Sequence, residues 1–543
     1  MLPAPRSSRS YSLRLAAANL YTGTTTLAAD ATVFGDPQAF GSSTSPVQLG
    51  SPAGDDNPEL SGDVGGMTLT RAITVNGSTS SVPSYALLGS RVPQGGGTIT
   101  YSGAITIAGS RSRLILFSTG EPVAFSGAIS GGTPAANVQV GFDFSSNDVT
   151  TQSNVILSGT STYAGGTTLA AGTLGINGNS LVVQPGNSLI HSPVGVGTLT
   201  IGIGTLAPSH EPTLVAVGAP RTIFNPVEVT RNFNVSGAHR LTFSGTLDLN
   251  DAARVITVDS ALTINGLLAG NASSALVKHG PGDLTLASSN TFPGSIVVGE
   301  GSMAINASQN LAGIFHVGPQ ARAILGPGSI AVPPGRNVLK AASVTVDSGN
   351  SGQLDLGDGG LIVDYTGPTP LSYVTSLIAT GYNASAWTGS GIASSRAAAE
   401  TNTGIGVIEA SDVGVGSFLG LSFVGDAVLA RYTLYGDNNL DGMVELADFA
   451  RLAAAFNAPG RWFHGDYDYS GVVDLSDFSR LAANFNQTLP SPLPRTAVPE
   501  PAASVALLAA WWLGQRRKVN RNIHRPAERT GISVRLNDAD RLE

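Results

Sequence analysis

The chain has 543 residues, of which 12% are charged, with a net charge of −8, and it contains no cysteine. The absence of cysteine excludes disulfides, cysteine-based zinc sites and a thiol nucleophile, and the acidic balance excludes nucleic acid as an expected partner. With 68 Gly and 42% hydrophobic residues, the composition is typical of β-structure with many tight turns around a large core.

The first residues, “MLPAPRSSRSYSLRLAAANLYTG”, carry positive charges but no apolar run long enough for a secretory signal peptide. Features later in the chain predict export. We therefore expect the start codon to be misplaced, so that the natural start differs from Met1.

Three segments, 21–34, 163–176 and 292–305, align without gaps. Each has an aromatic residue first, Gly two positions later, an aliphatic residue four positions after that Gly, and an apolar residue last. The pattern predicts two short strands joined by a turn, with the apolar side chains facing one core. Such a unit cannot bury its own apolar face and must stack on its neighbours. The sequence therefore predicts a mainly β fold, a right-handed parallel β-helix (β-solenoid) over residues 1–345.

Two longer stretches, “SGTSTYAGGTTLAAGTLGINGNSL” (158–181) and “GPGDLTLASSNTFPGSIVVGEGSMAINASQNL” (280–311), resemble the autotransporter-associated β-strand repeat. The resemblance implies an extracellular solenoid of the passenger type. A tandem of β-sandwiches is the alternative architecture, because short strands alone do not separate the two.

Polysaccharide lyases and hydrolases often use parallel β-helices, and their chemistry needs paired carboxylates or a carboxylate beside Arg or Lys. The candidate pairs are Asp143 with Asp148 and Asp355 with Asp358. Neither has specific flanking residues, and “DLGDGG” favours a turn role. The seven histidines have no metal-ligand spacing, and no GxSxG, HExxH or phosphate-binding loop occurs. We expect no enzyme; the alternative is a hydrolase or lyase acting on polysaccharide.

The pattern changes in residues 346–433, where strand-like runs surround a helix expected near Leu371–Thr380. “AVLARYTLYGD” (427–437) predicts a strand that leads into the next region. The segment resembles one found before calcium-loop repeats in planctomycete surface proteins. We expect it to be a β-rich junction that covers the open end of the solenoid.

Residues 434–487 contain two acidic copies, “GDNNLDGMVELADF” (436–449) and “GDYDYSGVVDLSDF” (465–478). Counted from Asp437 and Asp466, oxygen donors recur at positions 1, 3, 5, 7, 9 and 12 with Gly at position 6, as in an EF-hand-type calcium loop. Two Ca²⁺ sites are predicted. Their ligands would be Asp437, Asn439, Asp441, Met443 through its carbonyl, Glu445 and Asp448, and then Asp466, Asp468, Ser470, Val472 through its carbonyl, Asp474 and Asp477. Because Ser470 replaces an acid, we expect the second site to bind less tightly.

Each loop runs into a short predicted helix with an apolar stripe. The stripes are Leu446, Phe449, Leu452, Ala453 and Phe456, and Leu475, Phe478, Leu481, Ala482 and Phe485. We expect the two stripes to pack on each other and form one small core. The duplicated loop–helix pair resembles a type I dockerin, which implies a small α domain whose folding is coupled to calcium.

Cohesin-binding dockerins often carry hydroxyls at loop positions 10 and 11, where this chain has Leu446–Ala447 and Leu475–Ser476. Two alternatives therefore stay open for this region. One is a cohesin-like partner, and the other is a stabilising or self-associating calcium module.

The chain continues with a Pro-rich linker (488–497), a segment over 498–518 and a basic tail (519–543). The order “VPEP”, the apolar run “AASVALLAAWWLG” and the basic “QRRK” resembles the PEP-CTERM sorting signal. The resemblance implies export, a hold on the membrane through a C-terminal hydrophobic helix, and processing by an exosortase-type enzyme.

These features together are similar to a planctomycete-type, PEP-CTERM-sorted surface protein. The expected function is a non-enzymatic cell-surface or extracellular structural or adhesion protein. Its expected partners are the cell envelope or extracellular polysaccharide. The alternative is a polysaccharide-active β-helix enzyme, tethered through the dockerin-like domain.

Overall fold

The computed structural model describes residues 12–489, except 52–56, 78–84, 109–112, 135–136, 142–152, 185, 187, 204–210 and 327–335. Residues 1–492 and 493–543 form separate units, and all the described residues belong to the first. The predicted sorting segment and basic tail, with most of the linker, lie outside the described residues.

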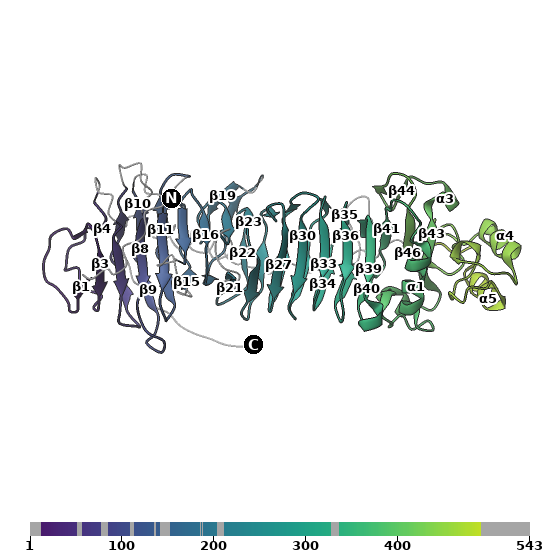
Figure 1. The fold of residues 1–543 in the computed structure, drawn as a ribbon, viewed down its shortest axis with the longest axis horizontal. Coiled ribbons are helices and arrows are strands. Elements are labelled where there is room, and N and C mark those ends of the chain that lie inside the picture. The colour runs from purple at the N-terminus through teal and green to yellow at the C-terminus, as the bar shows by residue number, and fades with distance from the viewer. Residues whose placement is uncertain are drawn as a thin grey trace, which may run out of the picture. The chain divides into compact units, whose positions relative to one another are not determined.

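Two long parallel sheets run through most of this unit (Figure 1). The eleven-stranded sheet contains, in spatial order, β1 (Ser12–Leu15), β3 (Ala31–Phe34), β5 (Glu59–Gly62), β8 (Tyr85–Ser90), β11 (Arg113–Ser118), β14 (Asn137–Val140), β16 (Thr167–Leu169), β20 (Leu199–Ile201), β23 (Val227–Val229), β26 (Leu247–Asp248) and β29 (Leu268–Ala269). The twelve-stranded sheet contains β6 (Thr68–Leu69), β9 (Ile99–Tyr101), β12 (Val123–Phe125), β15 (Asn154–Leu157), β17 (Thr173–Ile176), β21 (Thr213–Ala216), β24 (Phe233–Ser236), β27 (Ala253–Val258), β30 (Ala275–His279), β33 (Ser295–Val298), β36 (Ile314–Val317) and β39 (Ser343–Val346).

Further sheets complete the sides of the stack. A five-stranded sheet contains β2 (Thr26–Leu27), β4 (Val47–Leu49), β7 (Ile73–Val75), β10 (Ile105–Ile107) and β13 (Ile129–Gly131). An eight-stranded sheet contains β22 (Arg221–Ile223), β25 (Leu241–Phe243), β28 (Ala261–Ile264), β31 (Asp283–Leu286), β34 (Ser302–Ile305), β37 (Arg322–Leu325), β40 (Gln353–Asp355) and β42 (Gly391–Ala393). A six-stranded sheet contains β32 (Asn290–Phe292), β35 (Gln309–Leu311), β38 (Val338–Ala341), β41 (Gly360–Val363), β46 (Val428–Leu434) and β43 (Thr403–Glu409), and two antiparallel pairs join β18 (Leu181–Val183) to β19 (Ser188–His191) and β44 (Ser417–Phe418) to β45 (Leu421–Ser422).

From β20 to β41 each coil of the chain gives one strand to each of three sides of the stack. In the eleven-stranded sheet the strand starts recur after 20 or 21 residues, at Val227, Leu247 and Leu268. Strands of successive coils pair in parallel and in register, as Leu262 does with Leu284. The mainly β class is therefore confirmed, and the long parallel sheets agree with a β-solenoid. The right-handed sense stays a prediction.

The core lies inside the coils and is built from alternate residues of each strand. In β31, Leu284 and Leu286 are buried, whereas Asp283 is exposed. Leu262, Leu284 and Met303 of successive coils lie in line and are fully buried. Each such side chain contributes roughly 1.5–3 kcal/mol on burial. The coils are therefore held together by continuous rows of apolar contacts.

The aligned segments do form two short strands each, but the strands belong to different sheets, because the turn between them is a corner of the coil. Tyr163 and Phe292 fill the core, as the alignment predicts. Tyr21 does not: it lies on the surface and its hydroxyl bonds to that of Thr25 at 2.7 Å. The predicted strands are confirmed, while the aromatic position has no common role in the three copies.

The parallel ladders continue past residue 345, to β42 in the eight-stranded sheet and to β41 in the six-stranded sheet, where antiparallel strands follow. β46 pairs antiparallel with both β41 and β43. Four helical elements accompany these strands: η1 (Ser348–Asn350), α1 (Leu371–Tyr382), α2 (Ser395–Ala398) and α3 (Ala410–Val413). α1 packs on β42 and β43. The predicted helix and the predicted 427–437 strand are therefore present, and three short elements follow them: α4 (Leu446–Ala455), η2 (Trp462–His464) and α5 (Leu475–Asn484).

The shared Gly of the aligned segments allows a direct test of coil spacing. A Cβ at Gly294 would lie 2.2 Å from the backbone oxygen of Ser274 in the preceding coil, whereas one at Gly23 would meet nothing within 4 Å. We expect Gly294→Ala to lower the free energy of unfolding by roughly 1–3 kcal/mol through overpacking. Gly23→Ala is the matched control and should leave it nearly unchanged. Thermal unfolding followed by circular dichroism measures both, and equal melting temperatures would contradict the close packing of coils.

Candidate metal centre

Two acidic loops, the first loop (437–448) and the second loop (466–477), each enter a short helix. The first follows β46 and leads into α4; the second follows η2 and leads into α5. Both turn in the same way: the fourth residue is left-handed, with φ of 61° at Leu440 and 59° at Tyr469, and the sixth is a Gly with φ of 91° or 85°. Glycine adopts that conformation at little cost, so the sixth position sets the direction of each loop.

The aspartate that opens each loop is buried and binds the backbone of its own loop. The carboxylate of Asp437 accepts the N–H groups of the fifth and sixth residues at 3.1 and 2.9 Å. Asp466 accepts the equivalent N–H groups at 3.0 and 2.9 Å. This shared bonding holds the carboxylate oxygens on the inner side of the loop.

The aspartate that closes each loop also caps the helix that follows. Asp448 accepts the N–H groups of the second and ninth loop residues at 3.1 and 3.0 Å. Asp477 does the same at 2.8 and 3.0 Å. The bond from the ninth residue belongs to a capping box, which favours Asp here with or without a metal. Position 12 therefore has a structural role besides the predicted one.

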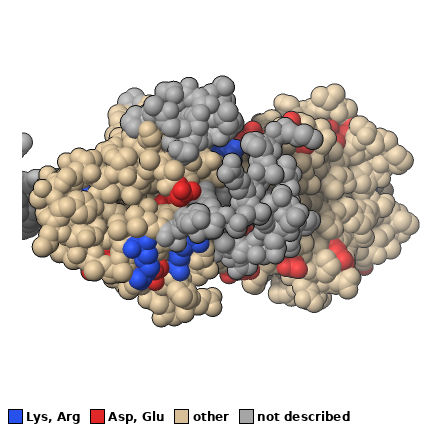
Figure 2. Space-filling model, turned by 60° about the vertical axis from the view of Figure 1, so that its left-hand side comes forward, with Lys and Arg blue, Asp and Glu red and all other residues tan. Residues whose placement is uncertain are grey.

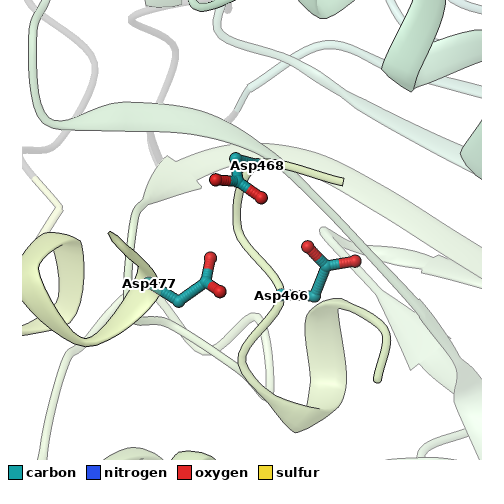
Figure 3. A group of neighbouring side chains, drawn as sticks. All are labelled: Asp466, Asp468 and Asp477. Carbon is teal, nitrogen blue, oxygen red and sulfur yellow. The ribbon is translucent and has the colours of Figure 1, made fainter. Parts of the chain in front are cut away.

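The second loop gathers three carboxylates, those of Asp466, Asp468 and Asp477 (Figure 3). One oxygen from each lies within 4.8 Å of the others. Because calcium binds oxygen at about 2.3–2.6 Å, two ligands of one ion lie at most about 5 Å apart. The trio therefore has a spacing that one calcium ion would span, and its hard oxygen donors are the type that calcium prefers.

The first loop has an amide where the second has a carboxylate. Asn439 donates its side-chain N–H to Asp441 at 2.8 Å, and its side-chain oxygen accepts the N–H of Asp441 at 3.2 Å. Within the described part of the chain, the first-loop carboxylates do not converge as the trio does. The carboxylates of the second loop thus lie closer together, while the predicted weaker binding at the second site stays a prediction.

The other predicted ligands have contacts of their own. Ser470 donates its hydroxyl to the Val472 carbonyl at 3.1 Å. Asp474 accepts the N–H of Ser476 at 2.7 Å as a helix cap, and Glu445 occupies the equivalent, exposed position in the first loop. Met443 forms an antiparallel bridge with a residue beyond α5. The structure therefore brings together the carboxylates at positions 1, 3 and 12 of the second loop. In both loops the residue at position 9 is the N-cap of the helix that follows.

Burial makes the ionised carboxylates costly. It raises the pKa of Asp437 to about 7, although Arg431 and a hydrogen bond from Thr433 oppose the shift. Burial also raises the pKa of Asp466 to about 6, and the nearby charges of Asp477 and Asp468 add to it. Buried like charges are stable only when a proton or a cation neutralises them. The donor set therefore fits a bound divalent cation.

The sequence does not reveal that each loop pairs with the segment beyond the other helix. Val444 of the first loop donates its N–H to the carbonyl of Gln487, beyond α5, at 3.0 Å. Val473 of the second loop donates to the carbonyl of Ala458, beyond α4, at 3.0 Å. The two loop–helix units are thus joined by two short crossed bridges.

The helices also cross over. Leu452 of α4 packs on Gly465 ahead of the second loop, and Leu481 of α5 packs on Gly436 ahead of the first. Both glycines have φ above 100°, and a Cβ there would lie 2.9 Å from Leu452 at Gly465 and 2.7 Å from Val444 and 3.2 Å from Leu481 at Gly436.

The expected core of two packed stripes is therefore wrong in extent. Leu452 and Leu481 are buried, Phe449 and Phe478 touch edge to face at 6.3 Å, and the other large residues of the stripes are exposed.

An aromatic cluster that the sequence does not reveal attaches the two acidic loops to the β-rich junction of residues 346–433. Trp462 donates its indole N–H to the backbone carbonyl of Asp437 at 2.7 Å and is buried. Tyr469 donates its hydroxyl to the carbonyl of Ile405 in β43 at 2.6 Å. The sequence signal is an aromatic residue close to each acidic loop, Tyr435 ahead of the first and Tyr469 inside the second. Such residues are also common in ordinary cores.

Of the two candidate catalytic pairs, the structure describes Asp355 and Asp358, and both of these pair with an arginine. Asp143 and Asp148 lie outside the described residues. Asp355 is buried, pairs with Arg322 at 2.9 Å and accepts the N–H of Gly357, which is the turn role. Asp358 pairs with Arg336 at 3.2 Å. In the part of the chain that the structure covers, no helix is long and apolar enough to span a membrane.

Comparison with known proteins identifies the repeats. Residues 12–29, 154–176 and 276–305 match the family model described as passenger-associated-transport-repeat. These segments overlap the predicted repeats, which are thereby confirmed there. Over 98 residues the chain is 37% identical to the adhesin BmaC autotransporter of Brucella suis biovar 1 (strain 1330), covering 18% of this chain and 3% of that protein. This chain thus spans a small fraction of the length of that relative. No solved structure matches the chain.

The raised pKa values predict how calcium affinity and stability change with pH. In the metal-free folded state Asp437 and Asp466 keep protons up to about pH 7 and 6, whereas unfolded aspartates release them near 3.8. The folded state therefore binds more protons in this window, and metal-free stability falls as pH rises through it. A calcium ion bound by these carboxylates would displace the same protons, so its apparent affinity should rise from about pH 5 to about pH 7 and then level off.

Calorimetric calcium titrations in buffers of different ionisation enthalpy measure both the affinity and the protons released. We expect about one to two protons released per chain near pH 5.5 and almost none near pH 8. An affinity that stays constant over this range would contradict the buried, protonated state of these carboxylates.

Proposed function

We propose that this chain is a non-enzymatic, exported surface protein with a structural or adhesive role. The observation that carries the proposal is that the three segments matching the passenger-associated repeat lie within coils of the long parallel sheets. A stack of coils offers extended, regular sides for contact with a surface. The similarity of one stretch to an adhesin supports the adhesive role.

The partner that fits best is a neutral polymer such as cell-envelope or extracellular polysaccharide. Most of the described surface on the face shown in Figure 2 is uncharged, and its Lys and Arg atoms gather mainly at the lower left beside acidic atoms. On the eight-stranded sheet Thr222, Thr242, Thr263 and Thr285 pair in register in successive coils and face outward. They form a column of hydroxyls at the strand spacing of about 4.8 Å. Such a column can exchange hydrogen bonds with the hydroxyls of a saccharide chain.

We further propose that the two acidic loops each bind one Ca²⁺. The trio of the second loop, the matching bonds of the opening aspartates and the burial of these carboxylates support this proposal. Calcium, when bound, would supply the positive charge that these carboxylates lack. The chain's own part is to hold the oxygens in place and to join the loops through the crossed bridges.

The proposal includes sorting to the cell surface through the C-terminal segment 498–518. Its support is the resemblance of the VPEP box, apolar run and basic flank to the PEP-CTERM signal. Export, contact with the membrane there and an exosortase-type processing enzyme follow from that resemblance.

The calcium proposal is tested by exchanging the residues at loop position 3. Asp468→Asn gives the second loop the amide of the first, and we expect the calcium affinity of one site to fall about tenfold because one carboxylate is lost. Asn439→Asp should raise the affinity of the other site. Asp248→Asn, an exposed carboxylate on the solenoid, is the control. Calorimetry on the full chain measures all three, and no calcium binding, or an equal effect of Asp468→Asn and Asp248→Asn, would refute the assignment.

The adhesion proposal is tested by removing hydroxyls from the threonine column. Thr242→Val with Thr263→Val should weaken binding to cell-envelope polysaccharide severalfold and leave the fold intact, because valine suits a strand equally well. Thr74→Val with Thr106→Val, on the five-stranded sheet, is the matched control. Binding to immobilised polysaccharide measures the effect. Equal losses in both variants would exclude this face, and release of shorter saccharides would instead identify a polysaccharide-active enzyme.

A further inference from the structure

The two loop–helix units leave large apolar side chains in water, and they do so in matched pairs. We call the apolar helix face the set Met443, Leu446, Phe449, Phe456, Val472, Leu475, Phe478 and Phe485. Each member of the first unit has a counterpart 29 residues later with nearly the same exposed fraction: 46 and 43%, 70 and 67%, 37 and 36%, and 41 and 39%. Neither half is covered by the rest of the described chain.

The two halves form one continuous surface. Along α4, Leu446, Phe449 and Phe456 share one side of the helix, and their counterparts do so along α5. The rings of Phe449 and Phe478 meet edge to face, so the two stripes join at this pair. Small side chains fill the exposed positions between the large ones, as Ala453 and Ala482 do. A partner can therefore approach the helices closely.

Along the two helices the apolar helix face carries no unpaired charge, while the exposed carboxylates Glu445 and Asp474 lie at its edge, at the starts of α4 and α5. The only charged residues of α4 and α5 are Asp448, Arg451, Asp477 and Arg480. Both aspartates are buried. Arg451 pairs with Asp448 at 3.2 Å, and Arg480 donates to the hydroxyl of Tyr382 at 2.8 Å. Two copies of an acidic chain repel each other, and the helical part of this face is where they can meet with few like charges opposed.

The size and symmetry of the face also suit a copy of itself. Eight side chains with these exposed fractions present on the order of 700 Å² of apolar surface, close to the roughly 800 Å² per partner of a standard interface. In a two-fold dimer each chain uses the same patch, so the patch must be self-complementary. A face whose two halves repeat each other satisfies that condition, because either stripe can pack on the opposite one of the second copy.

We propose that the chain forms a two-fold dimer through the apolar helix face, in which α4 and α5 of each copy pack as a four-helix cluster around Phe449 and Phe478. The occupant of the face is a second copy of this chain. The dimer goes beyond the adhesive role, since it brings two solenoids together at their capped ends and doubles any binding surface on them.

The test is the oligomeric state of the full chain in calcium-containing buffer, measured by sedimentation velocity over a range of concentrations. We expect a monomer–dimer equilibrium. Leu446→Glu with Leu475→Glu places like charges opposite each other in the dimer and should raise its dissociation constant by about tenfold or more. Both leucines are largely exposed, so the fold should persist, as circular dichroism can verify. Leu267→Glu with Val424→Glu alters exposed apolar residues elsewhere and should leave the dimer unchanged.

Phe456→Ser with Phe485→Ser, at the far ends of the stripes, is a second disrupting pair in case the first affects folding. A wild-type chain that stays monomeric at all concentrations overturns the proposal. A dimer that persists in both disrupting pairs also overturns it. That result is expected if two copies associate through the apolar run at 502–514 or through a different surface of the chain.

Discussion

Each coil of the solenoid depends on its two neighbours for backbone hydrogen bonds and for burial of its inward side chains. Val227 donates its N–H to the carbonyl of Thr246 in the next coil, and Leu247 donates to that of Leu267 in the coil after it, both at 2.8 Å. A terminal coil lacks one of these partners, so the stack requires a terminator. The antiparallel strand β46 provides it, and the same strand leads into the first acidic loop. The position of the loops is thus a consequence of how the ladder ends.

The repeats could be predicted because alternation and turn residues are local properties of the chain. They determine which side chains face inward, as at Leu169 and Ile305, but not which sheet a strand joins. The assignment of the two strands of one repeat to different sides of the coil depends on contacts between coils, which a single segment does not encode. The exposed Tyr21 has the same cause, since its local sequence matches that of Tyr163 while its surroundings differ.

The acidic loops could be placed because oxygen donors at fixed spacing are a strong signal. The spacing indicates neither the double role of Asp448 and Asp477 as helix caps nor the convergence of carboxylates in one loop only. It also cannot show whether an apolar stripe is covered. Leu452 and Phe456 belong to the same predicted stripe, yet one is buried against Gly465 and the other is in water. Which of them is covered depends on the partner unit.

The crossed bridges make the folding of each loop–helix unit depend on the other unit. Val444 and Leu481 find their partners on opposite units, so one loop–helix unit alone would have an unpaired strand and an uncovered leucine. The smallest complete form is two units, supplied by one duplicated chain or by two separate ones. A deletion of either copy removes these contacts from the survivor, and the duplication is therefore a condition of folding rather than a spare copy.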